Sequence, residues 1–189
     1  MPRVEAAEIE AVVSSTVKEI CPGVRCQACG SFRRGKVTCG DVDVLICPPS
    51  GQKDCEVLQT LLVRLHVSGF LTDDLALPGP HVPGHPQAYM GVCKLPGDGR
   101  KHRRLDIKVY PASMYAFAIL YFTGSDHFNR SMRVFANLRG LVLSDRGLSP
   151  VNCVGGEKVH RFPSYRCPTE RDVFVALGLE YVPPKERSV

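Results

Sequence analysis

The segment GSFRRGKVTCGDVDVLI, residues 30 to 46, constrains the fold of this chain more than any other. Successive side chains of a β-strand point to opposite faces, so Asp41 and Asp43 would project from one face, roughly 7 Å apart, while Val42 and Val44 fill the other. Two carboxylates held this close repel each other, which costs stability unless a cation lies between them. The segment therefore predicts a strand with one buried face and one acidic face.

An acidic strand face by itself is also compatible with a solvated edge strand, but the residues upstream favour a binding site. Gly30 and Ser31 precede a basic turn, in which backbone N–H groups, the Ser31 hydroxyl and Arg34 could hold phosphate. Carboxylate oxygens are hard ligands that suit Mg²⁺ or Mn²⁺. A triphosphate and its metal ions could thus bind within this one segment.

A third carboxylate, Asp106, lies in the segment RRLDIKVY, where apolar residues at alternate positions would form one face and Asp106 and Lys108 the other. Three carboxylates from two neighbouring strands could hold two metal ions about 4 Å apart, one activating an attacking hydroxyl and the other neutralising a leaving pyrophosphate. Asp106 would then be the natural general base. The alternative is a carboxylate that simply pairs with Arg103 or Arg104.

The remaining chain alternates helical and extended patterns, which predicts an α+β fold with a mixed sheet. Ser125 is a candidate helix cap, and Thr169 with Asp172 forms a candidate capping box. The Pro- and Gly-rich residues 78–86 predict a loop between two strands. We expect a first domain over residues 1–122 and a second over 123–189. Helices are predicted at 4–20, 54–67, 112–122, 126–138 and 170–177, strands at about 24–29, 42–47, 69–76, 88–95 and 103–110, and short extended runs over 141–166.

Composition excludes several classes of protein. No apolar run approaches the roughly 18 to 20 residues that cross a bilayer, and the amino-terminal segment lacks the order of a signal peptide. The nine cysteines are scattered singly, which indicates reduced thiols, and the pair Cys26 and Cys29 lacks the further ligands of a zinc site. The net charge of +5 favours a polyanionic partner only weakly, although basic residues cluster at 33–36, 100–104 and 130–133.

These motifs, in their order along the chain, resemble the catalytic part of family X DNA polymerases. The resemblance rests on Gly30-Ser31, the spaced Asp41 and Asp43, the later Asp106, and the segments YFTGS at 121–125 and HFNRSMR at 127–133. It covers nearly the whole chain and implies a nucleotidyltransferase-like palm followed by a small α/β thumb. It also implies that the three aspartates ligate two Mg²⁺ ions, with Mn²⁺ as a possible substitute.

The resemblance further implies contacts to the substrates. The aromatic pair before a glycine would pack against the nucleotide sugar, and the helix that follows would reach the nascent base pair from the minor groove. The implied contacts to the incoming nucleotide are Ser31, Arg34, Gly40, Tyr121, Phe122, Gly124, Asp126 and Asn129. The implied contacts to DNA are Arg130 and Arg133.

The function implied is that of a monomeric DNA-directed DNA polymerase core, which adds a dNTP to the primer 3′-hydroxyl of gapped or primer-template DNA. The setting would be nuclear gap-filling repair, in base excision repair and end joining. Because the resemblance begins after the lyase and helix-hairpin-helix regions of that family, we expect weak primer-template binding and no lyase chemistry. Two alternatives are a template-independent transferase, which the sequence TGS at 123–125 disfavours, and a non-catalytic DNA- or nucleotide-binding module, which the intact aspartates disfavour.

Overall fold

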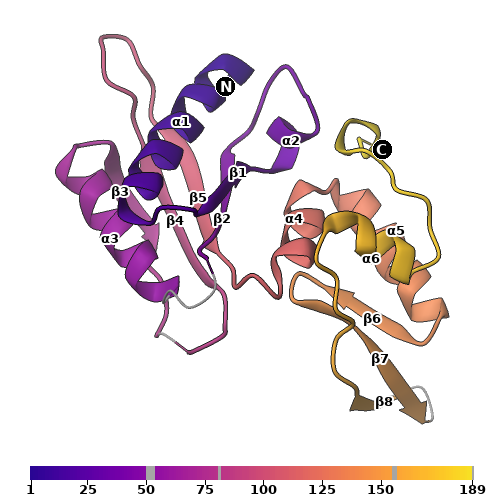
Figure 1. Cartoon of the computed structure of the whole chain (residues 1–189). Coiled ribbons are helices and arrows are strands. Elements are labelled where there is room, and N and C mark those ends of the chain that lie inside the picture. The colour runs from indigo at the N-terminus through magenta and orange to yellow at the C-terminus, as the bar shows by residue number, and fades with distance from the viewer. Residues whose placement is uncertain (50–53, 81, 155–156, 189) are drawn as a thin grey trace. The chain divides into compact units, whose positions relative to one another are not determined.

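The computed structural model describes residues 1–49, 54–80, 82–154 and 157–188, and the chain divides into two compact units, Met1–Ala112 and Ser113–Val189 (Figure 1). The expected boundary between residues 122 and 123 instead lies inside the second unit. The reason is helix α4 (Tyr115–Thr123), whose buried side chains Ala116, Phe117 and Leu120 belong to the core of the second unit.

The first unit is built on a five-stranded mixed sheet with the strand order β1-β2-β5-β4-β3. Strands β2 and β5 run parallel, and the other neighbouring pairs are antiparallel. The predicted strands and the mixed sheet are therefore confirmed, with ends shifted by one or two residues. The strands are β1 (Arg25–Ala28), β2 (Val42–Cys47), β3 (Leu71–Ala76), β4 (Gln87–Cys93) and β5 (Arg103–Val109).

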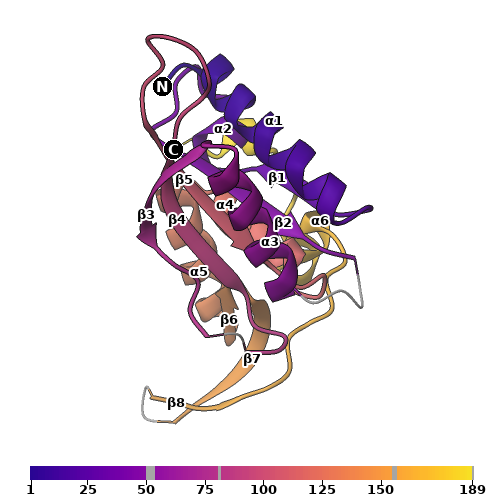
Figure 2. The same ribbon diagram turned by 90° about the vertical axis from the view of Figure 1, so that its left-hand side faces the viewer.

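Helices α1 (Arg3–Ile20) and α3 (Asp54–Val67) pack side by side on one face of this sheet (Figures 1 and 2). Their apolar side chains recur at helical spacing and meet the apolar side of the strands, where Val44 and Ile107 are fully buried. Because strand side chains alternate, the acidic residues of β2 and β5 project from the opposite face. A single helical turn, α2 (Gly30–Arg33), packs against β2.

An ion pair ties α1 to β5. Arg103 donates from Nε to Glu5 Oε1 at 3.0 Å and from Nη2 to Glu5 Oε2 at 2.6 Å. These hydrogen bonds lower the pKa of Glu5 below its ordinary value. A carboxyl group whose pKa is lower in the folded state stabilises the fold at neutral pH, and this contribution is lost as the pH falls through the folded pKa.

We therefore expect Glu5→Gln to lower the midpoint of thermal unfolding at pH 7 by a few degrees. The difference from wild type should narrow as the pH falls below about 4.3, the ordinary value for a glutamate in the unfolded chain. Thermal unfolding followed by circular dichroism at pH 7 and at pH 3 checks this expectation. A difference that stays constant across that range would contradict it.

In the second unit, α4 and α5 (Asp126–Leu138) pack against strand β6 of the three-stranded antiparallel sheet β6-β7-β8, and α6 (Glu170–Ala176) packs against α4. The predicted caps are confirmed: Ser125 Oγ accepts from Phe128 N–H at 3.3 Å, and Thr169 with Asp172 forms a capping box. Within the described ranges, none of the helices combines the length and apolar character that a bilayer crossing requires. The elements after α4 are α5 (Asp126–Leu138), β6 (Leu141–Ser144), β7 (Gly147–Val154), β8 (Glu157–Arg161), α6 (Glu170–Ala176) and the 3₁₀ turn η1 (Pro184–Glu186).

Candidate active site

Strand register places two of the predicted carboxylates side by side. Asp43 of β2 lies directly opposite Asp106 of β5 in the parallel pair. The residues on either side of each aspartate are fully buried in the apolar core, so both carboxylates project from the same face. Asp41 lies immediately before β2 and shares Arg104 with Asp106 as an ionic partner. The three aspartates that the sequence singles out thus meet at one place in the first unit.

Two cationic side chains lie among these carboxylates. Arg104 forms an ion pair with Asp41, and its Nε lies 3.6 Å from Asp106 Oδ1. Lys108 Nζ lies 2.8 Å from Asp43 Oδ1 and 3.6 Å from Asp106 Oδ2. Asp106 therefore forms an ion pair with a neighbouring arginine, Arg104, and this pairing was the alternative to a metal-binding role.

Arg104 and Lys108 were not among the residues predicted to form the site, although the sequence contains a pattern that indicates them. They stand two residues before and two residues after Asp106 on β5, so the alternation that predicts an acidic face places them on that face too. What the pattern could not predict is that both would contact the aspartates of the neighbouring strand segment.

Asp106 is the most buried of the three aspartates, with 7% of its surface exposed. Burial raises the pKa of its carboxyl group, the negative charge of Asp43 adds to that effect, and Lys108 and Arg104 oppose it. Its Oδ1 atom is buried and accepts no hydrogen bond from any residue in the described ranges. A buried oxygen without a donor is costly, so this atom is suited to contact a cation.

The donor set of this site fits a hard divalent cation. Carboxylate oxygens are the ligands that Mg²⁺ and Mn²⁺ prefer, and Asp106 Oδ1 is such an oxygen without a hydrogen-bond donor. As the side chains stand, however, no three acidic, histidine or cysteine side chains of the described residues are grouped as the ligands of one ion. We attribute this to Arg104 and Lys108, which hold Asp41 and Asp43 in ion pairs. Asp41, Asp43 and Asp106 therefore fit a divalent cation once their ion pairs with Arg104 and Lys108 open.

Gly30 brings the turn α2 close to the acidic strand. The backbone N–H of Cys29 donates to the carbonyl of Asp43 at 2.7 Å. Gly30 itself has a φ of +54°, and a Cβ at this position would lie 2.9 Å from Asp43 Oδ2. Both the left-handed backbone and the close approach therefore require a glycine here.

We expect Gly30→Ala to destabilise the first unit by about 1 to 2 kcal/mol through backbone strain. The same change should weaken metal binding, because the added methyl group pushes the Asp43 carboxylate from its place. Urea unfolding and Mn²⁺ titration of the variant check both effects. Gly40→Ala is the matched control, since a Cβ at Gly40 meets no protein atom within 4 Å. Equal stability of the two variants would contradict the expectation.

The three residues with implied triphosphate contacts lie beside this acidic strand or lead into it. Ser31 is in α2, and Arg34 ends it. Burial lowers the pKa of Arg34, while the nearby charge of Asp43 opposes that change. Gly40 is exposed just before Asp41. Their contacts to a triphosphate stay a prediction.

In the second unit, three of the residues with implied substrate contacts lie together. Asn129 Nδ2 donates to the carbonyl of Tyr121 at 2.7 Å. Tyr121, Asn129 and Arg133 line one small pocket with residues of α4 and β6. The ring of Phe122 packs edge-on against Tyr121 at 5.2 Å, and Gly124 ends α4 with a φ of +61° that suits a glycine.

Asp126 and Arg130 differ from this group because they pair with each other. Arg130 Nη2 lies 2.8 Å from Asp126 Oδ2, one turn apart on the exposed surface of α5. An exposed pair of this kind opens easily, so both charges remain available to a ligand. Their contacts to the nascent base pair and to DNA stay a prediction.

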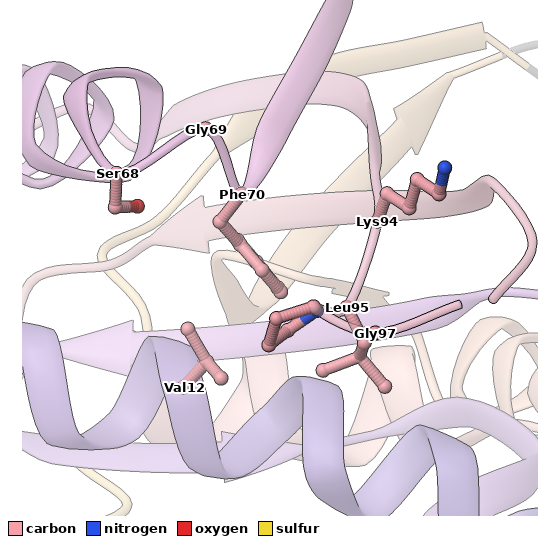
Figure 3. A pocket seen from close by; sticks show the side chains of 8 residues that line it. Val12, Ser68, Gly69, Phe70, Lys94, Leu95 and Gly97 are labelled. Atoms are coloured by element: carbon pink, nitrogen blue, oxygen red, sulfur yellow. The ribbon is translucent and has the colours of Figure 1, made fainter.

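The first unit also has a cavity of about 410 Å³ that is separate from the aspartates. It is lined by Val12 of α1, by residues 68–70 after α3 and by residues 94–97 after β4. In Figure 3 the side chains of Val12 and Phe70 point toward the same space, while the Lys94 ammonium group points away from it. The lining contains no carboxylate, and none of the predicted site residues belongs to it. This cavity is therefore distinct from the predicted metal site.

Two protein-family models match this chain, and each covers most of one unit of the fold. The family model for the DNA polymerase beta palm matches residues 1–112, and the model for the DNA polymerase beta thumb matches residues 118–188. The chain therefore belongs to the DNA polymerase beta family, which is family X. This confirms the family that the sequence motifs resemble, and the palm and thumb correspond to the two units of the fold.

Individual relatives come from animals and plants. The chain is 53% identical to DNA polymerase lambda of Rattus norvegicus over an alignment of 189 positions, which covers 99% of this chain and 33% of that protein. It is 36% identical to DNA polymerase lambda of Arabidopsis thaliana over 194 residues, covering 100% of the chain and 36% of the relative. It is 29% identical to the human DNA-directed DNA/RNA polymerase mu over 210 residues, covering 98% and 41%. The chain thus spans about a third of the length of the polymerase lambda relatives.

Proposed function

We propose that this chain is the catalytic core of a DNA-directed DNA polymerase, which transfers a deoxynucleotide from a dNTP to the 3′-hydroxyl of a primer at a gap in DNA. One observation carries the proposal: Asp43 and Asp106 lie in register on adjacent parallel strands, and Asp106 presents a buried oxygen without a hydrogen-bond donor. Membership of family X supports the same class of reaction.

Each aspartate has a proposed role. Asp41, Asp43 and Asp106 would hold two Mg²⁺ ions, and Mn²⁺ could replace them. When bound, the two ions would lower the pKa of the primer hydroxyl and neutralise the leaving pyrophosphate. Asp106 would accept the proton of that hydroxyl, and its raised pKa makes its carboxylate a stronger base than an exposed aspartate.

The other residues bind and orient the substrates in this proposal. Ser31 and Arg34 would hold the triphosphate, with the exposed backbone at Gly40 beside it. In the second unit, Tyr121, Asn129 and Arg133 would contact the nucleotide sugar, the nascent base pair and the template strand. Phe122, Gly124, Asp126 and Arg130 would take part in the same contacts. The proposed setting is nuclear gap-filling repair, and the chain is proposed to act as a monomer.

Single-nucleotide addition to a duplex with a one-nucleotide gap tests the function. We expect addition of the complementary dNTP in Mg²⁺ or Mn²⁺, much slower addition of the other three, and no addition in a chelator. High protein concentration and low salt are needed, because phosphate contacts dominate DNA affinity and this chain matches only part of its relatives' length.

Two other results would replace the proposal with its alternatives. Equal addition of all four dNTPs, also on single-stranded DNA, would indicate a template-independent transferase. Metal-dependent binding of dNTP without any addition would indicate a nucleotide-binding module. Asp106→Ala separates these cases further, because it abolishes addition by an enzyme and leaves DNA binding by a module intact.

A further inference from the structure

The segment that follows β8, residues 162–166 (FPSYR), carries two aromatic side chains on the surface of the second unit. Phe162 is 40% exposed and Tyr165 is 45% exposed, so they are the most exposed aromatic side chains in the described part of the chain. Tyr121 follows at 36%, and it already belongs to the proposed substrate contacts. Aromatic rings contribute much of the binding energy where a partner covers them, so two exposed rings in one short segment indicate a binding surface.

Hydrogen bonds hold this segment against strand β7. The N–H of Phe162 donates to the carbonyl of Pro150 at 3.0 Å, and the N–H of Tyr165 donates to the carbonyl of Leu148 at 2.8 Å. Between the two rings, Ser164 Oγ accepts a hydrogen bond from the N–H of Leu148 at 2.9 Å. The backbone that carries both rings is therefore fixed before a ligand arrives, which lowers the conformational entropy lost on binding.

Basic side chains surround the two rings. Residues 139–166 contain five arginines and lysines but two acidic residues. Arg166 ends the segment and is exposed. Arg146 lies on the turn between β6 and β7, beside the segment, since a Cβ at the next residue, Gly147, would lie 2.6 Å from a side-chain atom of the segment. Its side chain is 55% exposed and only 3.8 Å from Asp145 Oδ2, and an exposed pair of this kind opens easily.

This combination of rings and charges favours a nucleic acid over a protein as the partner. Every base of an unpaired strand has a face that stacks on an aromatic ring, and its phosphates are attracted to basic side chains. The centre of a protein interface is instead depleted of charged residues and needs a continuous apolar surface. The other large apolar side chains that are exposed in the described part of the second unit lie on α4, α5 and α6, outside this segment: Tyr121, Val134, Leu138 and Val175.

We propose that residues 162–166 form a separate contact site for single-stranded DNA. Phe162 and Tyr165 stack on bases of the unpaired strand, and Arg166 and Arg146 attract its phosphates. The site goes beyond the proposed function, because it needs neither metal nor nucleotide and uses none of the residues proposed for nucleotide transfer. It recognises unpaired bases without regard to sequence, since all four bases can stack.

Fluorescence anisotropy with a short labelled oligothymidine tests this site, in a chelator and without dNTP. We expect Phe162→Ala and Tyr165→Ala each to weaken binding by about fivefold or more, because each variant loses one stacked base. Tyr165→Phe should bind as wild type does, since the ring remains. Arg166→Gln should reduce the salt dependence of binding by about one phosphate contact. Val175→Ala and Arg171→Gln are controls for the loss of an exposed apolar side chain and of an exposed arginine elsewhere in this unit.

A blunt duplex separates stacking from charge, because its bases are already paired and stacked. The double variant Phe162→Ala with Tyr165→Ala should bind this duplex as wild type does and should bind the single strand much more weakly. Photo-crosslinking to an oligonucleotide that contains iododeoxyuridine gives a second readout, and peptide mapping should place the cross-link within residues 162–166.

Two outcomes would overturn the proposal. If the double variant, with unchanged circular dichroism, binds the single strand as wild type does, the rings do not contact DNA and the segment is a surface for a protein partner. If the double variant loses single-stranded and duplex binding equally, base stacking is not the contact. The proposed active site stands in both cases, because the chelator and the absence of dNTP keep it out of the measurement.

Discussion

Asp106→Asn is expected to lower the single-turnover rate of nucleotide addition by roughly 10³-fold or more. The asparagine keeps the size of the side chain, but it cannot accept the proton of the primer hydroxyl and it is a poorer ligand for a divalent cation. Because Asp106 is buried on a central strand, the variant loses charge without losing a core side chain. The expected loss is therefore in chemistry and metal binding, and the fold should persist.

Asp73→Asn is the matched control for this change. Asp73 is an exposed aspartate on the edge strand β3 of the same sheet, and it takes no part in the proposed site. Quenched-flow measurement of addition to gapped DNA should give wild-type rates for Asp73→Asn and the large loss for Asp106→Asn. Loss of less than about tenfold in Asp106→Asn, with unchanged circular dichroism, would show that Asp106 is not the base.

The second large effect is expected at Arg187, near the carboxyl end of the second unit. Its side chain is fully buried, Nη1 lies 2.7 Å from Glu170 Oε1, and both Nε and Nη2 donate to the carbonyl of Val182. The guanidinium group also lies 5.2 to 5.5 Å from the ring centroids of Phe128, Phe174 and Tyr181. Removing one partner of a buried ion pair costs about 3 to 5 kcal/mol, because the other charge is left unpaired.

Arg187→Met should accordingly lower the unfolding midpoint of the second unit by more than about 10 °C. Arg171→Met is the matched control, since Arg171 is an exposed arginine that also stacks on Tyr181. The double variant Glu170→Met with Arg187→Met should be more stable than the sum of the single changes predicts, because no buried charge is left alone. Hydrogen exchange measured by mass spectrometry assigns the loss to residues 113–189. Equal stability of Arg187→Met and Arg171→Met would contradict this account.

Much of the first unit could be predicted from local patterns. Strand β2 combines the buried residues Val42 and Val44 with the intervening Asp43, and this alternation predicts both the strand and the face of the site. The capping residues Ser125 and Thr169 similarly predict where α5 and α6 begin, because their side chains bond to the backbone within three residues.

Features that depend on contacts between distant segments could not be predicted in this way. The boundary between the units lies before α4, because Phe117 and Leu120 pack with residues far along the chain. The burial of Arg187 depends on Glu170, to which no local pattern connects it. Likewise, Lys108 is an ordinary strand residue in the sequence, and only the register of β2 with β5 brings it to Asp43.

The most direct test of the proposed site is anomalous diffraction at the manganese edge from crystals of this chain grown with Mn²⁺ and a non-hydrolysable dNTP. We predict two peaks about 3.5 to 4 Å apart, in contact with carboxylate oxygens of Asp41, Asp43 and Asp106. We also predict that Lys108 Nζ has left Asp43 in those crystals. Bound nucleotide with no manganese among these three aspartates would contradict the account.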